Sequence, residues 1–170
     1  GAVDDLVLGP REDGPVDPSQ RLFTLDVAVH GGASPIAPLG DIDGDGLGEL
    51  VVGAPPALPS RPGGWTAVYR GGEGSLLSSL DGPAPPLGQG SFGQHVAALG
   101  DVDGDGAPEY VASGFFDRIE DGGARGVVQL VDGATGAPEG APLVGPMLDG
   151  LGSALAALSD VDGDGVRDVA

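Results

Sequence analysis

The middle of the chain reads Gly100-Asp101-Val102-Asp103-Gly104-Asp105-Gly106. The same pattern stands earlier as Gly40-Asp41-Ile42-Asp43-Gly44-Asp45-Gly46 and later as Ser159-Asp160-Val161-Asp162-Gly163-Asp164-Gly165, at periods of 60 and 59 residues. An apolar run precedes each copy, and an acid with a strand-like run follows it. Self-similarity at such a period indicates a repeat protein, whose units bury their faces by stacking on neighbouring units.

Each period contains runs that predict four short strands. In the first complete period, the apolar run Ile36 to Leu39 leads into the acidic loop, and Glu49-Leu50-Val51-Val52 leads out of it. A Pro/Gly-rich connection, a third run at 64–71 and a tight turn closed by Gly74 follow, before a fourth strand. Four short strands in about 40 to 60 residues is the size of one propeller blade. We therefore expect an all-β chain of β-propeller blades, each made of four antiparallel strands.

The repeats organise the chain as a single propeller fragment, residues 1–170. The approximate repeats are 1–30 (a partial blade), 31–90, 91–149 and 150–170 (a partial blade). About three repeats are fewer than the roughly four blades that a closed ring needs, so we expect an incomplete ring within this chain. The N-terminal part offers a second strand, Asp5 to Leu8, and the C-terminal part offers a first strand with its loop. These halves are complementary, so we expect self-association or further blades to complete the propeller.

Composition and charge exclude several classes of function. The chain has 7 Lys+Arg against 26 Asp+Glu, and its net charge is −19 at pH 7. Such a field repels phosphate backbones and anionic lipids, so we expect no nucleic-acid binding, whereas inorganic cations become natural partners. No apolar run approaches the roughly 20 residues of a membrane span, so we expect no membrane insertion. Because the chain has no Cys, disulfides, thiolate metal sites and Cys nucleophiles are excluded.

The acids of each loop stand at positions 1, 3, 5 and 9. Three carboxylates at i, i+2 and i+4 repel one another without a cation, whereas calcium takes six to eight oxygens at about 2.3 to 2.6 Å. A backbone carbonyl at position 7 would add one oxygen, and glycines at positions 4 and 6 allow left-handed turns around the ion. We predict about three Ca²⁺ sites, with Asp41, Asp43, Asp45, Leu47 and Glu49 in loop 1, Asp101, Asp103, Asp105, Ala107 and Glu109 in loop 2, and Asp160, Asp162, Asp164, Val166 and Asp168 in loop 3.

Other interpretations fit the loops less well. A solvated Asp/Gly turn needs no ligand, but the threefold recurrence with its ninth acid favours a site. An EF-hand needs Glu at position 12 and flanking helices, whereas Val52 and Ala112 stand there among β-like residues. Calcium-binding nonapeptide helices repeat every nine residues, which this chain does not do. Gly88-Gln89-Gly90-Ser91-Phe92-Gly93 matches the dinucleotide fingerprint, but a strand-like run follows it where that site needs a helix.

The segment 91–106, which begins Ser91-Phe92-Gly93, and the preceding Val51-Val52-Gly53-Ala54-Pro55 resemble the FG-GAP repeat of integrin α-subunit N-terminal β-propellers and related bacterial proteins. The resemblance implies a propeller with calcium in the D-x-D-x-D-G-x-x-D loops that join the first two strands of a blade, and partners docked on the opposite face. Gly32-Ala33 and Leu151-Gly152 replace Phe-Gly in two repeats. The integrin-type ligand function does not carry over, because it depends on a partner subunit.

From these features we expect an extracellular or cell-surface, secreted module that binds calcium and is not an enzyme. It would act as a structural scaffold or as an adhesion and protein-interaction surface for a protein or glycan whose identity the sequence does not give. Two alternatives remain open. The blades belong to a larger secreted hydrolase or lyase as a non-catalytic propeller part, or the chain is the subunit of a self-assembling surface fibre or layer.

Overall fold

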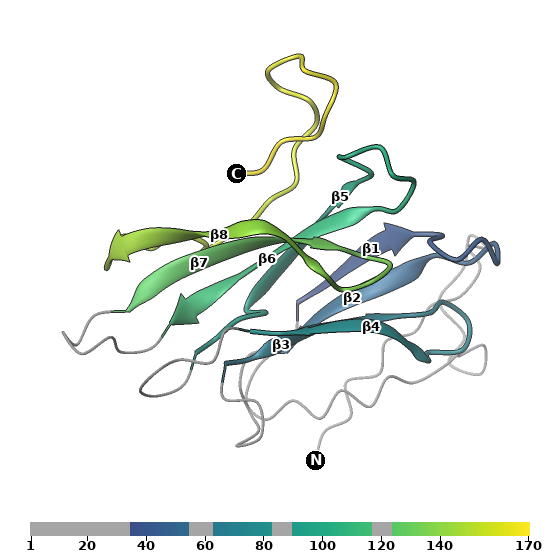
Figure 1. Cartoon of the computed structure of the whole chain (residues 1–170), viewed down its shortest axis with the longest axis horizontal. Coiled ribbons are helices and arrows are strands. Elements are labelled where there is room, and N and C mark those ends of the chain that lie inside the picture. The colour runs from purple at the N-terminus through teal and green to yellow at the C-terminus, as the bar shows by residue number, and fades with distance from the viewer. Residues whose placement is uncertain (1–34, 55–62, 83–89, 117–123) are drawn as a thin grey trace, which may run out of the picture.

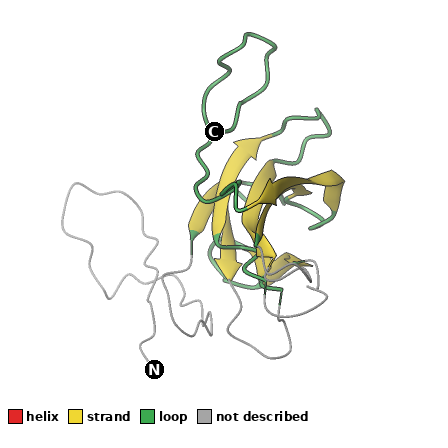
Figure 2. Ribbon diagram, turned by 90° about the vertical axis from the view of Figure 1, so that its left-hand side faces the viewer, coloured by secondary structure: helices red, strands yellow, loops and turns green. Residues whose placement is uncertain are grey.

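The computed structural model describes residues 35–54, 63–82, 90–116 and 124–170. Strands and loops make up this described part, and no helix occurs in it (Figure 2). The predicted partial blade at 1–30, with its strand from Asp5 to Leu8, lies outside the described residues. The all-β prediction is confirmed.

Eight strands form two antiparallel sheets of four (Figure 1). The first sheet has the order β1-β2-β3-β4 and contains β1 (Ile36–Gly40), β2 (Glu49–Ala54), β3 (Trp65–Tyr69) and β4 (Leu76–Asp81). The second sheet has the order β5-β6-β7-β8 and contains β5 (His95–Gly100), β6 (Glu109–Phe116), β7 (Arg125–Asp132) and β8 (Pro138–Met147). Each sheet is therefore one blade of four consecutive strands, as predicted, and we call the two sheets blade 1 and blade 2.

A shared core joins the two blades. Alternation along β1 buries Ala37 and Leu39 while Ile36 and Pro38 stay exposed, as expected for a strand with one buried face. The buried residues of blade 1 pack against one face of blade 2, and β1 lies next to β5. The members of this core are Ala37, Leu39, Val51, Val68, Phe92, Tyr110, Ala112, Val127 and Val131.

Two buried polar contacts cross between the blades. Thr66 Oγ1 and the Tyr110 hydroxyl are hydrogen-bonded at 2.8 Å, and Ser78 Oγ donates to the Gly133 carbonyl at 2.9 Å. Burial raises the pKa of Tyr110 to about 12, against the lowering effect of its bond with Thr66. Each contact satisfies a polar group that would otherwise be desolvated without a partner.

Glycines let the backbone of one blade touch the segment that starts the next. A Cβ on Gly53 would lie 2.1 Å from the Gly93 carbonyl oxygen, and one on Gly64 would lie 2.1 Å from that of Phe92. The amide of Phe92 also donates to the Gly63 carbonyl at 2.9 Å. Because no side chain fits at these positions, the distance between the two backbones is fixed.

The same contact recurs at the start of a third unit. A Cβ on Gly126 would lie 1.9 Å from the carbonyl oxygen of Leu151, which stands where Phe92 stands one repeat earlier. Further on, Ala157 pairs antiparallel with Val169, matching the pairing of Ala98 with Tyr110. Residues 150–170 therefore begin a third unit in the register of the first two, and the replacement of Phe-Gly by Leu-Gly leaves this contact in place.

The second face of blade 2 is apolar and only partly covered. Ala97, Leu99 and Val111 pack there with partly buried neighbours that include Leu155 from the third unit. A hollow of about 420 Å³ lies between this face and residues 151–170, and Leu143 at its margin is 66% exposed.

Candidate metal centres

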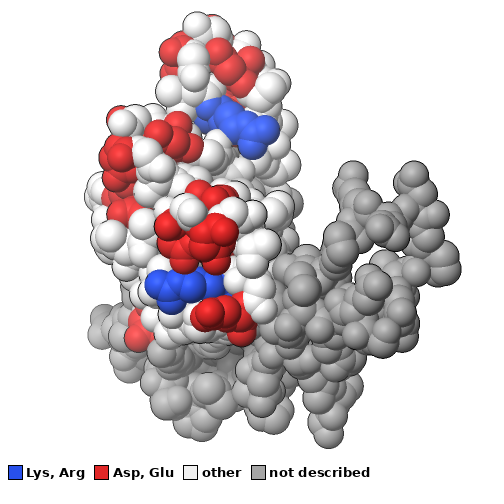
Figure 3. Space-filling view, turned by 90° about the vertical axis from the view of Figure 1, so that its right-hand side faces the viewer, with Lys and Arg blue, Asp and Glu red and all other residues white. Residues whose placement is uncertain are grey.

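Each acidic loop is a tight turn that its glycines allow. Loop 1 joins β1 to β2, and loop 2 joins β5 to β6, at the same side of the molecule (Figure 1). Gly44 and Gly46 have φ angles of 78° and 91°, and the matching glycines of loops 2 and 3 are also in the left-handed region. Figure 3 shows that this side carries separate groups of acidic side chains. Within the described residues, most of the acids thus lie in the loops that join strands.

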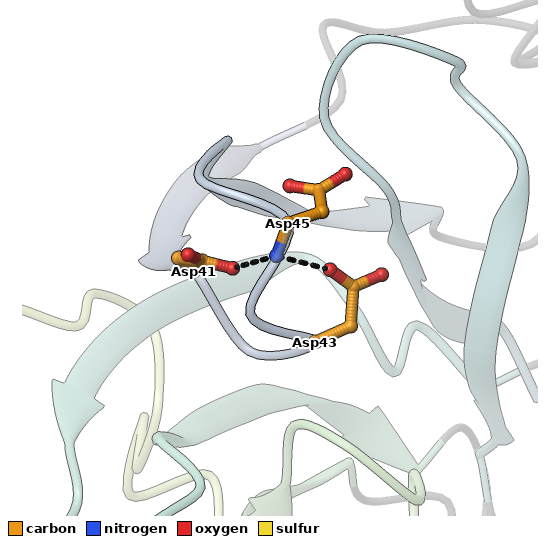
Figure 4. A group of neighbouring side chains, drawn as sticks. All are labelled: Asp41, Asp43 and Asp45. Atoms are coloured by element: carbon orange, nitrogen blue, oxygen red, sulfur yellow. Dashed lines mark hydrogen bonds between the residues drawn. The ribbon is translucent and has the colours of Figure 1, made fainter.

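Within loop 1, backbone amides turn the carboxylates inward. Asp41 Oδ1 accepts from the amides of Gly44 at 2.8 Å and Asp45 at 3.1 Å, and its Oδ2 accepts from Gly46 at 2.9 Å. Asp43 Oδ1 accepts from the amide of Asp45 at 3.3 Å, so this amide lies between two carboxylates (Figure 4). Loops 2 and 3 repeat this arrangement, with the first acid accepting from positions 4 and 6. The loops are therefore ordered by their own backbone.

The ninth acid has a role that the sequence pattern did not indicate. In every loop one of its carboxylate oxygens accepts the amide of position 2: Glu49 from Ile42 at 2.5 Å, Glu109 from Val102 at 2.6 Å, and Asp168 from Val161 at 2.6 Å. This bond closes the loop across seven residues. A regular partner at position 2 was not visible in the sequence, because any residue supplies a backbone amide.

The structure brings three acids of each predicted set together, with one oxygen from each within 4.8 Å of the others. The three groups are Asp41, Asp43 and Asp45 in loop 1, Asp101, Asp103 and Glu109 in loop 2, and Asp160, Asp162 and Asp168 in loop 3. The remaining acids, Glu49, Asp105 and Asp164, lie outside these groups. The carbonyl oxygens of Leu47, Ala107 and Val166 stay predicted ligands.

Loop 2 contains a buried oxygen that a cation would satisfy. Glu109 is fully buried, and its Oε1 atom has no hydrogen-bond partner. Burial is the main cause that raises the pKa of Glu109, and the charges of Glu139, Asp103 and Asp105 add to it, while the bond from Val102 opposes it. An ionised carboxylate is expensive in such a place unless a positive charge faces it. Asp101 and Asp103 beside this unsatisfied carboxylate make an oxygen donor set that fits a hard divalent cation.

A family model for FG-GAP-like repeats matches residues 41–112, which extend from the first acid of loop 1 into β6. Together with the blades and the loops between their first two strands, this match decides the family. The chain belongs to the FG-GAP repeat proteins.

Two integrin α-subunits are similar to this FG-GAP protein over most of its length. It is 31% identical to integrin alpha-4 from Xenopus laevis in an alignment of 146 residues that covers 76% of the chain. It is 33% identical to integrin alpha-V from Gallus gallus in an alignment of 138 residues that covers 78% of the chain. The FG-GAP chain spans 13% of the length of each relative. No helix in its described residues has the length and hydropathy to cross a bilayer.

Proposed function

We propose that this FG-GAP chain is a calcium-binding propeller module, secreted or displayed at a cell surface, that serves as a scaffold or adhesion surface and not as an enzyme. The observation that carries the proposal is the buried, unpartnered Oε1 of Glu109 beside Asp101 and Asp103 in loop 2. Three acids also gather in each of the other two loops. Similarity to two integrin α-subunits supports the adhesion role and the extracellular location. The proposed sites are the fifteen residues predicted above.

The chain's own residues would do the following at each site. The acids at positions 1 and 3 offer carboxylate oxygens in every loop, joined by position 5 in loop 1 and by position 9 in loops 2 and 3. The ninth acid also braces each loop through the amide of position 2. A bound cation supplies the positive charge that neutralises these carboxylates. Because the amides already orient the acids, calcium binding needs little rearrangement of the loops. We expect dissociation constants of roughly 10⁻⁴ to 10⁻³ M, as in other extracellular modules.

The change Asp103→Ala tests this function. Calorimetric titration with calcium should show one site fewer than the unchanged chain, and the calcium-dependent rise in melting temperature should shrink, because one filled site contributes about 2.7 kcal/mol when calcium is 100 times its Kd. Glu73→Ala removes an exposed acid outside the loops and should change neither quantity. Absence of heat and of any melting shift in the unchanged chain would refute calcium binding.

A second candidate, self-association or pairing with further blades, is favoured by the apolar face of blade 2. Leu99, Val111 and Leu155 leave a hollow there, and Leu143 at its margin is 66% exposed. The opposite face of blade 2 is covered by blade 1. A further blade, from this protein or from a second copy, would cover the free face in the same way.

A further inference from the structure

Loops 1 and 2 are alike in sequence, but their neighbours carry opposite charges. Arg70 precedes Gly71 at the end of β3, and the matching residue before Gly133 at the end of β7 is Asp132. One position after the start of the fourth strand, blade 1 has Leu77 where blade 2 has Glu139. Loop 1 is thus flanked by a cation, and loop 2 by two further acids.

In blade 1 the cation already contacts a proposed ligand. Arg70 Nε donates to Asp43 Oδ2 at 2.9 Å, and the two side chains are 36% and 25% exposed. Asp43 Oδ1 accepts from the amide of Asp45 at 3.3 Å. Both oxygens of this central acid are therefore engaged. The matching Asp103 accepts from Asp105 at 3.0 Å through Oδ1, and within the described residues it has no ion pair.

The ninth acids of loops 1 and 2 also differ in the number of hydrogen-bond donors that they have. In blade 1, Glu49 Oε1 accepts the amide of Gly71 at 3.2 Å, so both carboxylate oxygens have donors. In blade 2 the matching amide of Gly133 donates instead to the Pro108 carbonyl at 3.1 Å. Glu109 Oε1 is left buried and without a partner. Loop 2 retains an unsatisfied negative oxygen, and loop 1 does not.

Asp132 holds a fixed negative charge beside loop 2. Its Oδ2 accepts from Thr135 Oγ1 at 2.6 Å, and its Oδ1 accepts from the amides of Ala134 and Thr135. These three bonds lower the pKa of Asp132 against the effect of burial. Asp132 is also the strand partner of Glu109. Burial raises the pKa of Glu139 most, and the negative charge of Asp103 raises it further. Glu139 therefore adds its negative charge to the surroundings of Asp103.

We propose that Arg70 makes loop 1 a low-affinity cation site, while Asp132 and Glu139 make loop 2 a high-affinity site. This inference rests on the proposed calcium binding and deepens it. As calcium rises, loop 2 fills first. Loop 1 fills when the ion displaces the Arg70 guanidinium from Asp43, which frees a cationic side chain on a face that carries several acidic groups. The two loops therefore bind calcium over two different ranges of calcium concentration.

The test is a calcium titration of the full chain followed by nuclear magnetic resonance, with the loop glycine amides as local reporters. Gly44 and Gly46 report loop 1, and Gly104 and Gly106 report loop 2. In the unchanged chain, the loop 2 glycines should reach saturation at a calcium concentration about tenfold lower than the loop 1 glycines, since a nearby unit charge changes the energy of a divalent ion by more than a kcal/mol.

Substitutions separate the contributions. Arg70→Gln should tighten binding at loop 1 about tenfold and leave loop 2 unchanged, whereas Arg70→Lys should keep loop 1 weak if the charge itself opposes the ion. Asp132→Asn with Glu139→Gln should weaken loop 2 alone. Arg125→Gln is the matched control for Arg70→Gln. It also removes one positive charge, but at the first residue of β7, the end of that strand opposite Asp132.

Each outcome has a distinct meaning. Equal affinities at loops 1 and 2, or equal effects of Arg70→Gln and Arg125→Gln on loop 1, would overturn the inference while calcium binding stands. If no loop glycine shifts at any calcium concentration, the proposed function itself fails, and the inference fails with it.

Discussion

At the scale of single residues, the ninth acid of each loop braces the turn as well as carrying charge. Glu49 and Glu109 accept the same amide of position 2, but only Glu49 has a donor for its second oxygen. The difference arises because the amide of Gly71 reaches a carboxylate, whereas that of Gly133 reaches a carbonyl. One hydrogen bond therefore decides which of two similar acids keeps a buried oxygen without a donor.

The change Glu109→Gln should stabilise the calcium-free protein and weaken calcium binding at loop 2. Burial raises the pKa of Glu109 above its usual 4.5, so the folded state holds this proton more tightly than the unfolded state. The stability that it contributes is complete below pH 4.5 and is lost as the pH rises through the raised folded pKa. The gain in melting temperature of Glu109→Gln over the unchanged chain should therefore grow in chelator as the pH rises from 4.5 through the raised pKa of Glu109.

Asp105→Asn is the control for this change, because Asp105 is exposed in the same loop. Thermal unfolding followed by circular dichroism measures the difference. Asp132 contributes in the opposite direction, because its pKa is lowered in the folded state. This contribution to stability is present above pH 3.8 and is lost as the pH falls through the lowered pKa, so it does not change in the range of this test. A gain that is independent of pH would contradict a buried ionised Glu109.

The positions of the acids were predictable from the sequence, and their partners were not. Asp41, Asp43 and Asp45 lie within five residues of chain, so their grouping follows from local spacing. The bond from Arg70 to Asp43 joins residues 27 apart. It exists because β3 pairs with β2 and ends beside loop 1, which is a property of the sheet.

At the scale of strands, the sequence predicted the first three of each blade closely and the fourth weakly. The run expected at 64–71 became β3 (Trp65–Tyr69), since glycines bound it. The fourth strand of blade 2, β8, contains Pro138, Pro142 and Pro146, which usually argue against a strand. Among the described strands it pairs with β7 alone, and proline is tolerated on such an edge because the outer amides need no partner.

The change Gly53→Ala should separate the two blades. The new Cβ would meet the Gly93 carbonyl oxygen at 2.1 Å, and backbone must move to relieve the overlap. We expect a loss of about 2 kcal/mol or more in the free energy of unfolding, measured by urea denaturation. Gly48→Ala is the matched control, because a Cβ there lies no closer than 3.7 Å to other atoms. Equal losses in the two variants would argue against a close contact between blades.

At the scale of the whole molecule, the exposed apolar face of blade 2 predicts association. Size exclusion with light scattering should give a mass above that of one chain in calcium, and a lower mass in chelator, which loosens loop 3 beside this face. Leu143→Ser should reduce the association without lowering the melting temperature, since Leu143 is 66% exposed. Leu76→Ser, at a 54% exposed leucine of blade 1, should leave the association unchanged. A single-chain mass in both conditions would contradict this prediction.

The glycine contacts between successive units have a geometric consequence. Gly53 and Gly64 hold the start of blade 2 at backbone distance, and Gly126 holds the start of the third unit in the same way. Gly64 and Gly126 thus constrain the rotation from one unit to the next through backbone contacts, whereas Ser113 replaces Gly53 at the second junction and donates to the Gly152 carbonyl at 2.7 Å. The number of units that complete a circle is then a full turn divided by this rotation, so a change at one small residue would alter the circumference of the whole assembly.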